Sequence, residues 1–438
     1  MAPILTRLMI LLNNFIPCFR QKRTFRYLVA FFKGFILNGR KTVTRIFTNS
    51  DDDRHWTNFY RFLKKYKWEA DSLFEKLCSI AAEKMKAATR KTKMLSENVF
   101  GVLDPTYAEK SGKKFDGSGL FFDHSAEKYI WGHCIFIQGL LIPLATGNWT
   151  AIPVQASIFI RKATLEKEGR EEEFETMIEK AVNMTKQLSE QVSKPLTMVA
   201  DAFFYKKKFF AKLYESGIFV LTRCRSDAVA YRPAEQPKVN KRGRPKKYGE
   251  KVKLMELLKI EILSIMCVNI KGKMQEVEYV MKDLLIRGFA HPVRFLVIKA
   301  KIPVILMTTN LNLTAAQMLE IYSARFQIEF CIRDMKQHLG ITQYQVRRFE
   351  AVKKFLNIAV MIYSLIKIEF FTNSAFQSIV TGKLDLPWRK SVPAFSFEQS
   401  LEVIRRETRL LQFFDTYAQT PKQGKIPEKT KGITGSLI

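Results

Sequence analysis

Between residues 98 and 223 the apolar positions switch between strand-like and helix-like spacing. Helical spacing occurs at residues 171–192 and 206–215. Strand-like runs occur at NVFGVLD (98–104), KYIWGHCIFIQGLLI (128–142), NWTAIPVQASIFI (148–160), PLTMVA (195–200) and GIFVLTR (217–223). Three strands, a helix, a strand, a helix and a strand predict a mixed α/β sheet with flanking helices.

Two of these apolar runs end at an acidic residue. Asp104 closes the first run and Asp201 follows the fourth, and a lysine-rich stretch after Asp104 is expected to be a loop. Carboxylates at the ends of neighbouring strands meet at one edge of a sheet, where polar chemistry can reach solvent. The order of elements is that of a ribonuclease H-like sheet, so we expect Asp104 and Asp201 to lie together.

The stretch Thr314 to Gly340 predicts one long helix. Thr314 with Gln317 forms a capping box, and Gly340 suits a left-handed C-terminal cap. At about 100° per residue, one polar stripe spans roughly 60° of this helix. Its members are Tyr322, Arg325, Glu329 and Lys336. Apolar residues on both shoulders, among them Phe326 and Phe330, indicate that the helix packs on two sides.

The rest of the chain suggests further domains. Residues 1–95 have helical apolar spacing with interleaved basic residues, and residues 224–311 alternate as strands of an all-β insertion. The predicted α/β domain therefore comes in two parts, 96–223 and 312–372, because the interval from Asp201 to Glu329 is too long for one connection. Residues 373–438 predict helices and a polar, disordered tail.

Charge narrows the class of partner. The 438 residues include 72 Lys and Arg against 42 Asp and Glu, a net charge of +30, which favours a polyanion. Nucleic acid is the first candidate and an anionic membrane is the rival, but no amphipathic anchor or lipidation signal is present.

The apolar stretch 355–371 is interrupted by Lys367 and Glu369 and predicts a buried helix. Six cysteines without a paired motif favour a reducing cytoplasm over disulfides or zinc.

A basic segment opens the predicted insertion. KVNKRGRPKKYGEKVK (238–253) contains an Arg-Gly-Arg-Pro core similar to a minor-groove AT-hook. We favour a loop that contacts DNA phosphates generally, because a single hook inside a folded domain is weak support for base reading. A flexible basic loop without function is the alternative. The candidate contacts are Arg242, Arg244, Lys246 and Lys247.

The spacing of Tyr322, Arg325, Glu329 and Lys336 resembles the Tyr-Arg-Glu-Lys signature of one branch of bacterial insertion-sequence transposases, the DDE enzymes. The alternative is a solvent-exposed charged helix face without a function in catalysis or binding. The resemblance implies that Asp104, Asp201 and Glu329 are catalytic carboxylates that bind two Mg²⁺ ions, for which Mn²⁺ can substitute. It also implies that Tyr322, Arg325 and Lys336 hold phosphates of the transposon end.

Further expectations follow from the same resemblance. The N-terminal helical domain would recognise the terminal inverted repeats, and the enzyme would cleave and join double-stranded DNA at transposon ends and target as a homodimer. It would act in the cytoplasm, associated with the nucleoid, and bind no membrane. A ribonuclease H-like nuclease or resolvase without strand transfer, and an inactive DNA-binding protein, are the alternatives.

Three smaller groups of residues complete the sequence hypotheses. Relatives that cut through a hairpin stack a flipped base on a tryptophan of the insertion, but none occurs between Trp149 and Trp388, so the aromatic candidates are Tyr231, Tyr248 and Phe289. His124 and His133 are predicted to have structural or supporting roles rather than to bind zinc. The acidic run 51–53 is expected to cap the following helix.

Overall fold

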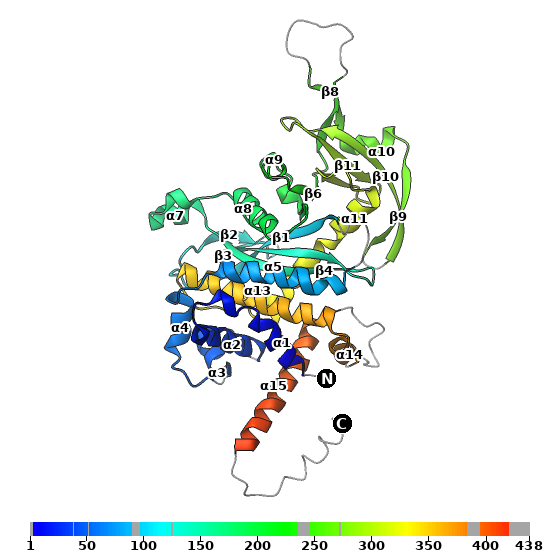
Figure 1. Cartoon of the computed structure of the whole chain (residues 1–438). Coiled ribbons are helices and arrows are strands. Elements are labelled where there is room, and N and C mark those ends of the chain that lie inside the picture. The colour runs from blue at the N-terminus through cyan, green and yellow to red at the C-terminus, as the bar shows by residue number, and fades with distance from the viewer. Residues whose placement is uncertain are drawn as a thin grey trace.

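The computed structural model describes residues 3–37, 39–50, 52–89, 97–123, 126–234, 246–270, 273–382 and 395–419, with the side chains of 411–419 excepted. At its centre lies a twelve-stranded mixed sheet (Figure 1). The strands of its first part are β1 (Val99–Glu109), β2 (Gly119–Asp123), β3 (Lys128–Pro143), β4 (Trp149–Phe159), β5 (Leu196–Ala200) and β6 (Phe219–Arg223).

The first part of the sheet has antiparallel strands on one side of β1 and parallel strands on the other. β3 pairs antiparallel with β1, β2 and β4, whereas β1 pairs parallel with β5, and β5 with β6. The predicted strands and helices therefore occur in the predicted order, with β2 as an additional strand and a short additional helix at Lys162–Glu168. The short strand β5 is fully buried and the middle of β6 is buried, because helices cover the sheet on both faces.

The insertion continues the same sheet, because β12 pairs antiparallel with β6. From β12 the order runs through β11, β10 and β7 to β8, and β9 pairs with β10. One short helix, α10 (Leu257–Ile260), interrupts the strands, so the prediction of an all-β insertion is wrong in this detail. The strands are β7 (Val229–Pro233), β8 (Tyr248–Lys253), β9 (Ser264–Ile270), β10 (Lys273–Leu285), β11 (Pro292–Ile298) and β12 (Val304–Thr308).

Helices cover both faces of the first part of the sheet. α8 (Met177–Glu190) and α9 (Lys207–Tyr214) lie on the upper face in Figure 1, next to β1 and β6, and α7 (Lys162–Glu168) lies beside them. Thr176 begins α8 with a capping box to Glu179. The opposite face is covered by α13 (Phe349–Thr372) and α5 (Ala70–Lys84), both of which contact β4.

Helix α13 is the buried axis of the lower half of the molecule. It is long and apolar enough to cross a membrane by length and composition, yet nearly all of its side chains are buried inside the protein. The predicted buried helix at 355–371 is therefore confirmed. Its amide side chain Asn357 bonds both the N–H and the C=O of Ala156 in β4, at 3.0 and 2.9 Å, which ties the helix to the sheet.

The described N-terminal residues form helices, as predicted, and these pack on α13. An aromatic cluster joins them, in which Phe62 contacts Phe19, Tyr27, Phe31 and Trp68. One continuous hydrophobic core therefore includes these helices, α13 and the sheet. The helices are α1 (Ile4–Asn13), α2 (Lys22–Ile36), α3 (Val43–Ser50) and α4 (Thr57–Lys64), followed by α5.

Helices α14 (Ser374–Gly382) and α15 (Phe397–Gln419) follow α13, and α15 contacts α1 and α2. The tail beyond Gln419 lies outside the described residues, as does the predicted disorder there. Between the insertion and α13 the chain forms α11 (Ala315–Ala324) and α12 (Phe326–Gln337). α12 contacts β1, β3 and β4, and this placement brings its polar residues to the sheet.

Candidate active site

Asp104 lies inside β1 and not at its end. The strand continues to Glu109 because residues 100–109 pair with β3, so the predicted loop after Asp104 is wrong for residues 105–109. Pairing with β5, however, runs only from Val99 to Val102. Asp104 therefore lies just past the end of the parallel pairing, on a strand held by β3, and its side chain is 21% exposed.

Asp201 directly follows β5, as the sequence predicts. Its backbone C=O accepts hydrogen bonds from Thr222 Oγ1 at 3.0 Å and from the N–H of Phe204 at 2.9 Å. These contacts fix the turn after β5 against β6. Because β1 and β5 are parallel neighbours, the two aspartates reach the same edge of the sheet.

Glu329 comes to this edge on α12. The stretch predicted as one helix is divided at Arg325, where the N–H of Arg325 bonds the C=O of Tyr322 and the N–H of Ile328 bonds the C=O of Arg325. These bonds span three residues instead of four, which tightens the turn without changing the helical direction of the backbone. The predicted capping box at Thr314 and the left-handed Gly340 are both present.

The side chain of Arg325 lies among the three acids. Its Nη2 is 2.9 Å from Glu329 Oε1 and 3.9 Å from Asp201 Oδ1, and its Nη1 is 3.9 Å from Asp104 Oδ1. Arg325 is buried, with 7% of its side chain exposed, while Asp201 and Glu329 are open to solvent on one side. Acids that are far apart in the sequence thus surround one guanidinium.

Burial and the neighbouring acids set the protonation of this group. Burial raises the pKa of Asp104 to about 7, Arg325 opposes the rise, and Glu329 and Asp201 add to it. For Arg325, burial lowers the pKa, but Tyr322 and the acids outweigh it, so the pKa is raised and the guanidinium stays charged. Near neutral pH the site can therefore gain or lose a proton at Asp104 without losing its central cation.

The donor set suits a divalent cation in its chemistry, because three carboxylates supply hard oxygen ligands. In the described part of the chain, no three acidic, His or Cys side chains stand close enough to hold one ion. Arg325 lies where such an ion would contact them. An ion that took all three acids as ligands would have to replace Arg325 at Glu329.

Two models of known protein families match this chain. The model described as "DDE superfamily endonuclease" matches residues 14–263, more than half of the chain, and the model described as "Transposase DDE domain" matches residues 169–365. The chain belongs to the DDE superfamily endonucleases. The first match covers Asp104 and Asp201 and the second covers Asp201 and Glu329, so together they span all three acids.

No curated protein matches this DDE superfamily chain in sequence. Among solved structures, it is similar to the piggyBac transposase in a synaptic complex with hairpin DNA. That likeness has 11% sequence identity and a TM-score of 0.40, and it covers 98% of this chain and 85% of the other.

The three predicted phosphate contacts of this DDE protein have different surroundings. Arg325 is bound to acids instead of facing outward, and Tyr322 is buried, with burial raising its pKa. Lys336 is half-buried beside Asp104 and Asp123, and burial lowers its pKa against their opposing effect. Arg325 would have to leave its ion pair with Glu329 to meet a phosphate and Tyr322 is buried, so Lys336 is the most accessible of the three. Phosphate binding by Tyr322, Arg325 and Lys336 stays a prediction.

The apolar shoulder of α12 also differs from expectation. Phe326 and Phe330 are 38% and 43% exposed and line a cavity instead of a core. Sequence patterning could not separate these two cases, because an aromatic residue on an amphipathic helix has the same spacing in both.

The described part of the basic segment, residues 246–253, lies at the far end of the sheet from the acids. Arg242 and Arg244 fall outside the described residues, whereas Lys246 and Lys247 are exposed just before β8. Tyr231 and Tyr248 are half-buried and in ring contact at 5.3 Å. Phe289 is 5% exposed and packed against Phe210 and Tyr214, so its proposed stacking on a base is wrong.

Two smaller predictions have clear outcomes. His133 is buried, with Nδ1 2.6 Å from Tyr344 Oη and Nε2 3.0 Å from the C=O of Asp116, which confirms a structural role; His124 lies outside the described residues. The acidic run does not cap α4, because Asp52 pairs with Arg54 and the helix begins without a side-chain cap. Asp51 lies outside the described residues.

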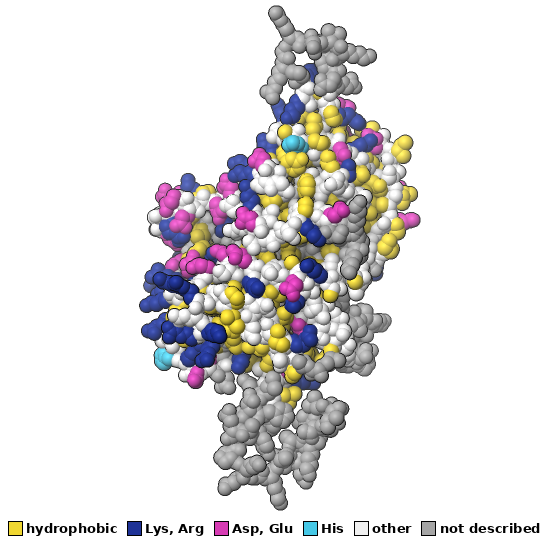
Figure 2. Space-filling model, in the orientation of Figure 1, with side chains coloured by type: hydrophobic (Ala, Val, Ile, Leu, Met, Phe, Trp, Pro, Cys, Tyr) yellow, Lys and Arg dark blue, Asp and Glu magenta, His cyan; other side chains and the backbone are white. Residues whose placement is uncertain are grey.

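Sequence reasoning missed a basic hollow on the N-terminal helices. A cavity of about 540 Å³ at the start of α2 is surrounded by six cationic side chains and two tyrosines. Lys and Arg also gather over these helices in Figure 2. The three-residue spacing of Arg20, Arg23 and Arg26 was the available signal, because it places cations along one side of a turn. The remaining members are Arg54, Lys65, Lys67, Tyr27 and Tyr66.

Proposed function

We propose that this DDE superfamily chain is a transposase of the insertion-sequence branch with the Tyr-Arg-Glu-Lys signature. It binds terminal inverted repeats as a homodimer at the nucleoid and catalyses cut-and-paste transposition on a ribonuclease H-like fold. The observation that carries the proposal is the meeting of Asp104, Asp201 and Glu329 around one guanidinium, within a chain that matches DDE family models.

In this proposal, Asp104, Asp201 and Glu329 hold two Mg²⁺ ions, or Mn²⁺ in their place. Bound divalent ions would activate the attacking oxygen and stabilise the leaving oxygen of a phosphodiester. Asp104 is fixed by the β1–β3 pairing, and Asp201 and Glu329 approach it from the β5 turn and α12. Three acids from three elements supply ligands without requiring a nucleophilic side chain.

Arg325 has two roles in this proposal. Without metal it offsets part of the negative charge of the acids, whose mutual repulsion would otherwise oppose folding of the site. Once released from Glu329, its planar guanidinium can bind a phosphate in two-point fashion, which an ammonium cannot. Lys336 lies on α12, the helix that carries Glu329, and is only half-buried, so it would hold a neighbouring phosphate.

The N-terminal basic hollow and the segment before β8 would bind DNA away from the acids. Six cations around one hollow suit phosphate oxygens, and such contacts position DNA without reading its sequence. The net charge of +30 supports the same partner.

A strand-transfer assay tests the proposal. The full chain is incubated with Mg²⁺, a plasmid target and DNA that carries the sequences flanking its gene. We expect cleavage at the ends and joining to the target, and we expect Asp201→Asn to abolish both while retaining DNA binding in a gel-shift assay. Asp227→Asn, which changes an exposed acid paired with Arg225, is the matched control and should retain activity.

The arms of this assay separate the alternatives. Cleavage without joining of a precut end would indicate a nuclease, and neither reaction with retained binding would indicate a DNA-binding protein. Equal cleavage by wild type and Asp201→Asn would contradict the proposed site.

A further inference from the structure

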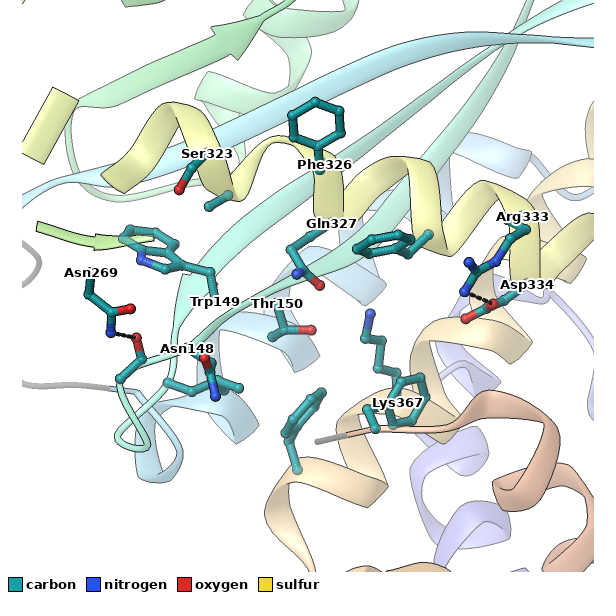
Figure 3. A pocket seen from close by; sticks show the side chains of 16 residues that line it. Asn148, Trp149, Thr150, Asn269, Ser323, Phe326, Gln327, Arg333, Asp334 and Lys367 are labelled. Atoms are coloured by element: carbon teal, nitrogen blue, oxygen red, sulfur yellow. Dashed lines mark hydrogen bonds and ion pairs between the residues drawn. The ribbon is translucent and has the colours of Figure 1, made fainter. Parts of the chain in front are cut away.

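A second cavity lies on the face of α12 that is turned away from the acids. It has a volume of about 580 Å³ and is bounded by α12, the end of α13, the turn between β3 and β4, and Asn269 of β9 (Figure 3). Its helical positions include Ser323, Gln327 and Phe330, which lie roughly 100–160° around the helix from Glu329. The cavity is therefore separate from the candidate active site.

A buried ammonium group points into this cavity. Lys367 is 3% exposed, and its Nζ contacts Cys331 Sγ at 3.3 Å and lies 5.0 Å from the ring centre of Phe395. Among the described residues, no carboxylate pairs with it. A buried ammonium without an acid partner is costly, and an anionic ligand would supply the missing charge.

Polar side chains surround the same point. Thr150 is 1% exposed and its hydroxyl has no hydrogen-bond partner among the described residues. Thr150, Gln327 and Lys367 point toward one another (Figure 3). At the edge, Asn269 donates to the C=O of Gly147 at 3.1 Å and leaves its buried Oδ1 without a partner in the described structure. Buried polar groups that line one cavity and lack hydrogen-bond partners indicate that a polar molecule binds there.

The walls of the cavity are aromatic. Phe330, Phe371, Phe395 and Trp149 line it, and Arg333 stacks over Phe330 with 5.1 Å between the guanidinium carbon and the ring centre. Lys367, Arg333 and Asp334 give this lining a net charge of +1, since Asp334 is the one acid among its residues. An anion attached to a flat ring matches this combination of charge and aromatic surface.

We propose that this cavity binds a nucleotide, with its phosphate monoester at Lys367 and Thr150 and its base against the aromatic wall. The nucleotide is either a free mononucleotide or the 5′-phosphorylated end of a DNA strand, which present the same chemistry. This site goes beyond the proposed function, because none of its contacts uses the three acids.

Calorimetric titration of the full chain with AMP tests the inference. We expect AMP to bind more tightly than adenosine or inorganic phosphate, because each of these fills half of the site. Thr150→Val removes the hydroxyl at nearly constant shape and should weaken AMP binding by about 5- to 10-fold. Lys367→Met keeps the side-chain length, suits a buried position and should weaken it by about 10- to 100-fold, as for a lost charged hydrogen bond.

Lys353→Met is the matched control on the same helix. Lys353 pairs with Asp71 at 3.0 Å and lies about 21 Å along α13 from Lys367, so this variant should bind AMP like wild type. Thermal melting of each variant checks that it is folded.

Two oligonucleotides identify the source of the nucleotide. They share one sequence and carry either a 5′-phosphate or a 5′-hydroxyl. If only a strand end fits, AMP will not bind, the phosphorylated strand will bind more tightly than the hydroxyl strand, and Lys367→Met will remove that difference. The inference is overturned if AMP and the 5′-phosphate both have no effect, or if Thr150→Val and Lys367→Met bind them as wild type does.

Discussion

At the scale of single residues, Arg325 and Asp104 set the electrostatics of the acidic site. Arg325 supplies one positive charge to three carboxylates, and Asp104 takes up a proton near neutral pH because it is buried. The two effects act in the same direction, since each lowers the cost of holding acids together without metal.

Without metal, the Asp104→Asn variant should be more stable than wild type, and this difference should grow as pH rises. The folded pKa of about 7 exceeds the unfolded value, so the stability contributed by Asp104 is present below about pH 4 and is lost as pH rises through 7. The variant lacks this loss, and its advantage at pH 8 should reach at most about 4 kcal/mol. Melting temperatures at pH 5 and pH 8 with a chelator measure it.

The control for this comparison is Asp227→Asn, which should behave as wild type at both pH values because Asp227 is exposed. An Asp104→Asn protein whose melting temperature differs from wild type equally at pH 5 and pH 8 would contradict the raised pKa.

Arg325→Gln should destabilise the metal-free protein at pH 8, because three carboxylates then lack their shared cation. Added Mn²⁺ should restore stability, since an ion that binds only the folded state stabilises it by mass action. The measurement is the melting temperature against Mn²⁺ concentration. Arg225→Gln, which loses only an exposed pair with Asp227, should show neither effect. Destabilisation that Mn²⁺ does not relieve would show that Arg325 matters for packing alone.

At the scale of elements, the sequence predicted the strands and helices around the acids well. Strong alternation and apolar runs identify β3, β4, β5 and β6 because these strands are buried. The continuation of β1 past Asp104 was missed because Pro105 and the lysines beyond it resemble a loop. Past Val102, β1 has left β5, and proline is tolerated where a strand has an open side.

The division of the long helix at Arg325 could not be predicted for a different reason. Arg325 keeps helical backbone angles, so the apolar spacing continues through it and only the hydrogen bonds change. The position of Arg325 among the acids likewise depends on contacts between β1, β5 and α12, which spacing along the chain does not contain.

The contact between α13 and β4 leads to a prediction about stability. Asn357→Leu removes the amide that satisfies the N–H and C=O of Ala156, and two buried backbone groups then lack partners. We expect a loss of about 2–4 kcal/mol, measured as a lower unfolding midpoint in urea. Asn183→Leu, at an exposed position of α8, should change stability by less than about 0.5 kcal/mol. Equal midpoints for the two variants would refute the role of Asn357.

At the scale of the whole molecule, the N-terminal helices, α13 and the sheet share one core while the insertion extends the same sheet. Six basic side chains line the N-terminal hollow, and Lys246 and Lys247 are exposed just before β8. The N-terminal helices and β8 lie toward opposite ends of the molecule in Figure 1. A long polyanion could contact both ends. The net charge of the sequence suggested a polyanionic partner, but it could not show where on the molecule that partner would bind.

Arg23→Glu should weaken binding to a duplex in the basic hollow. Loss of one phosphate contact should reduce the slope of log affinity against log salt by about 1. Fluorescence anisotropy between 50 and 200 mM salt, a range suited to such slopes, measures it. Lys162→Glu makes the same charge change on α7, where Lys162 faces Glu166, and should leave the slope nearly unchanged. Identical slopes for both variants would remove the hollow from the DNA interface.

The central claim is that Asp104, Asp201 and Glu329 form one divalent-metal site. Electron paramagnetic resonance of free Mn²⁺ measures metal binding directly, without DNA and without knowledge of the transposon ends. Asp104→Asn, Asp201→Asn and Glu329→Gln should each weaken Mn²⁺ binding by at least about tenfold, while Asp227→Asn binds as wild type. Mn²⁺ binding that is unchanged in all three variants would contradict the account.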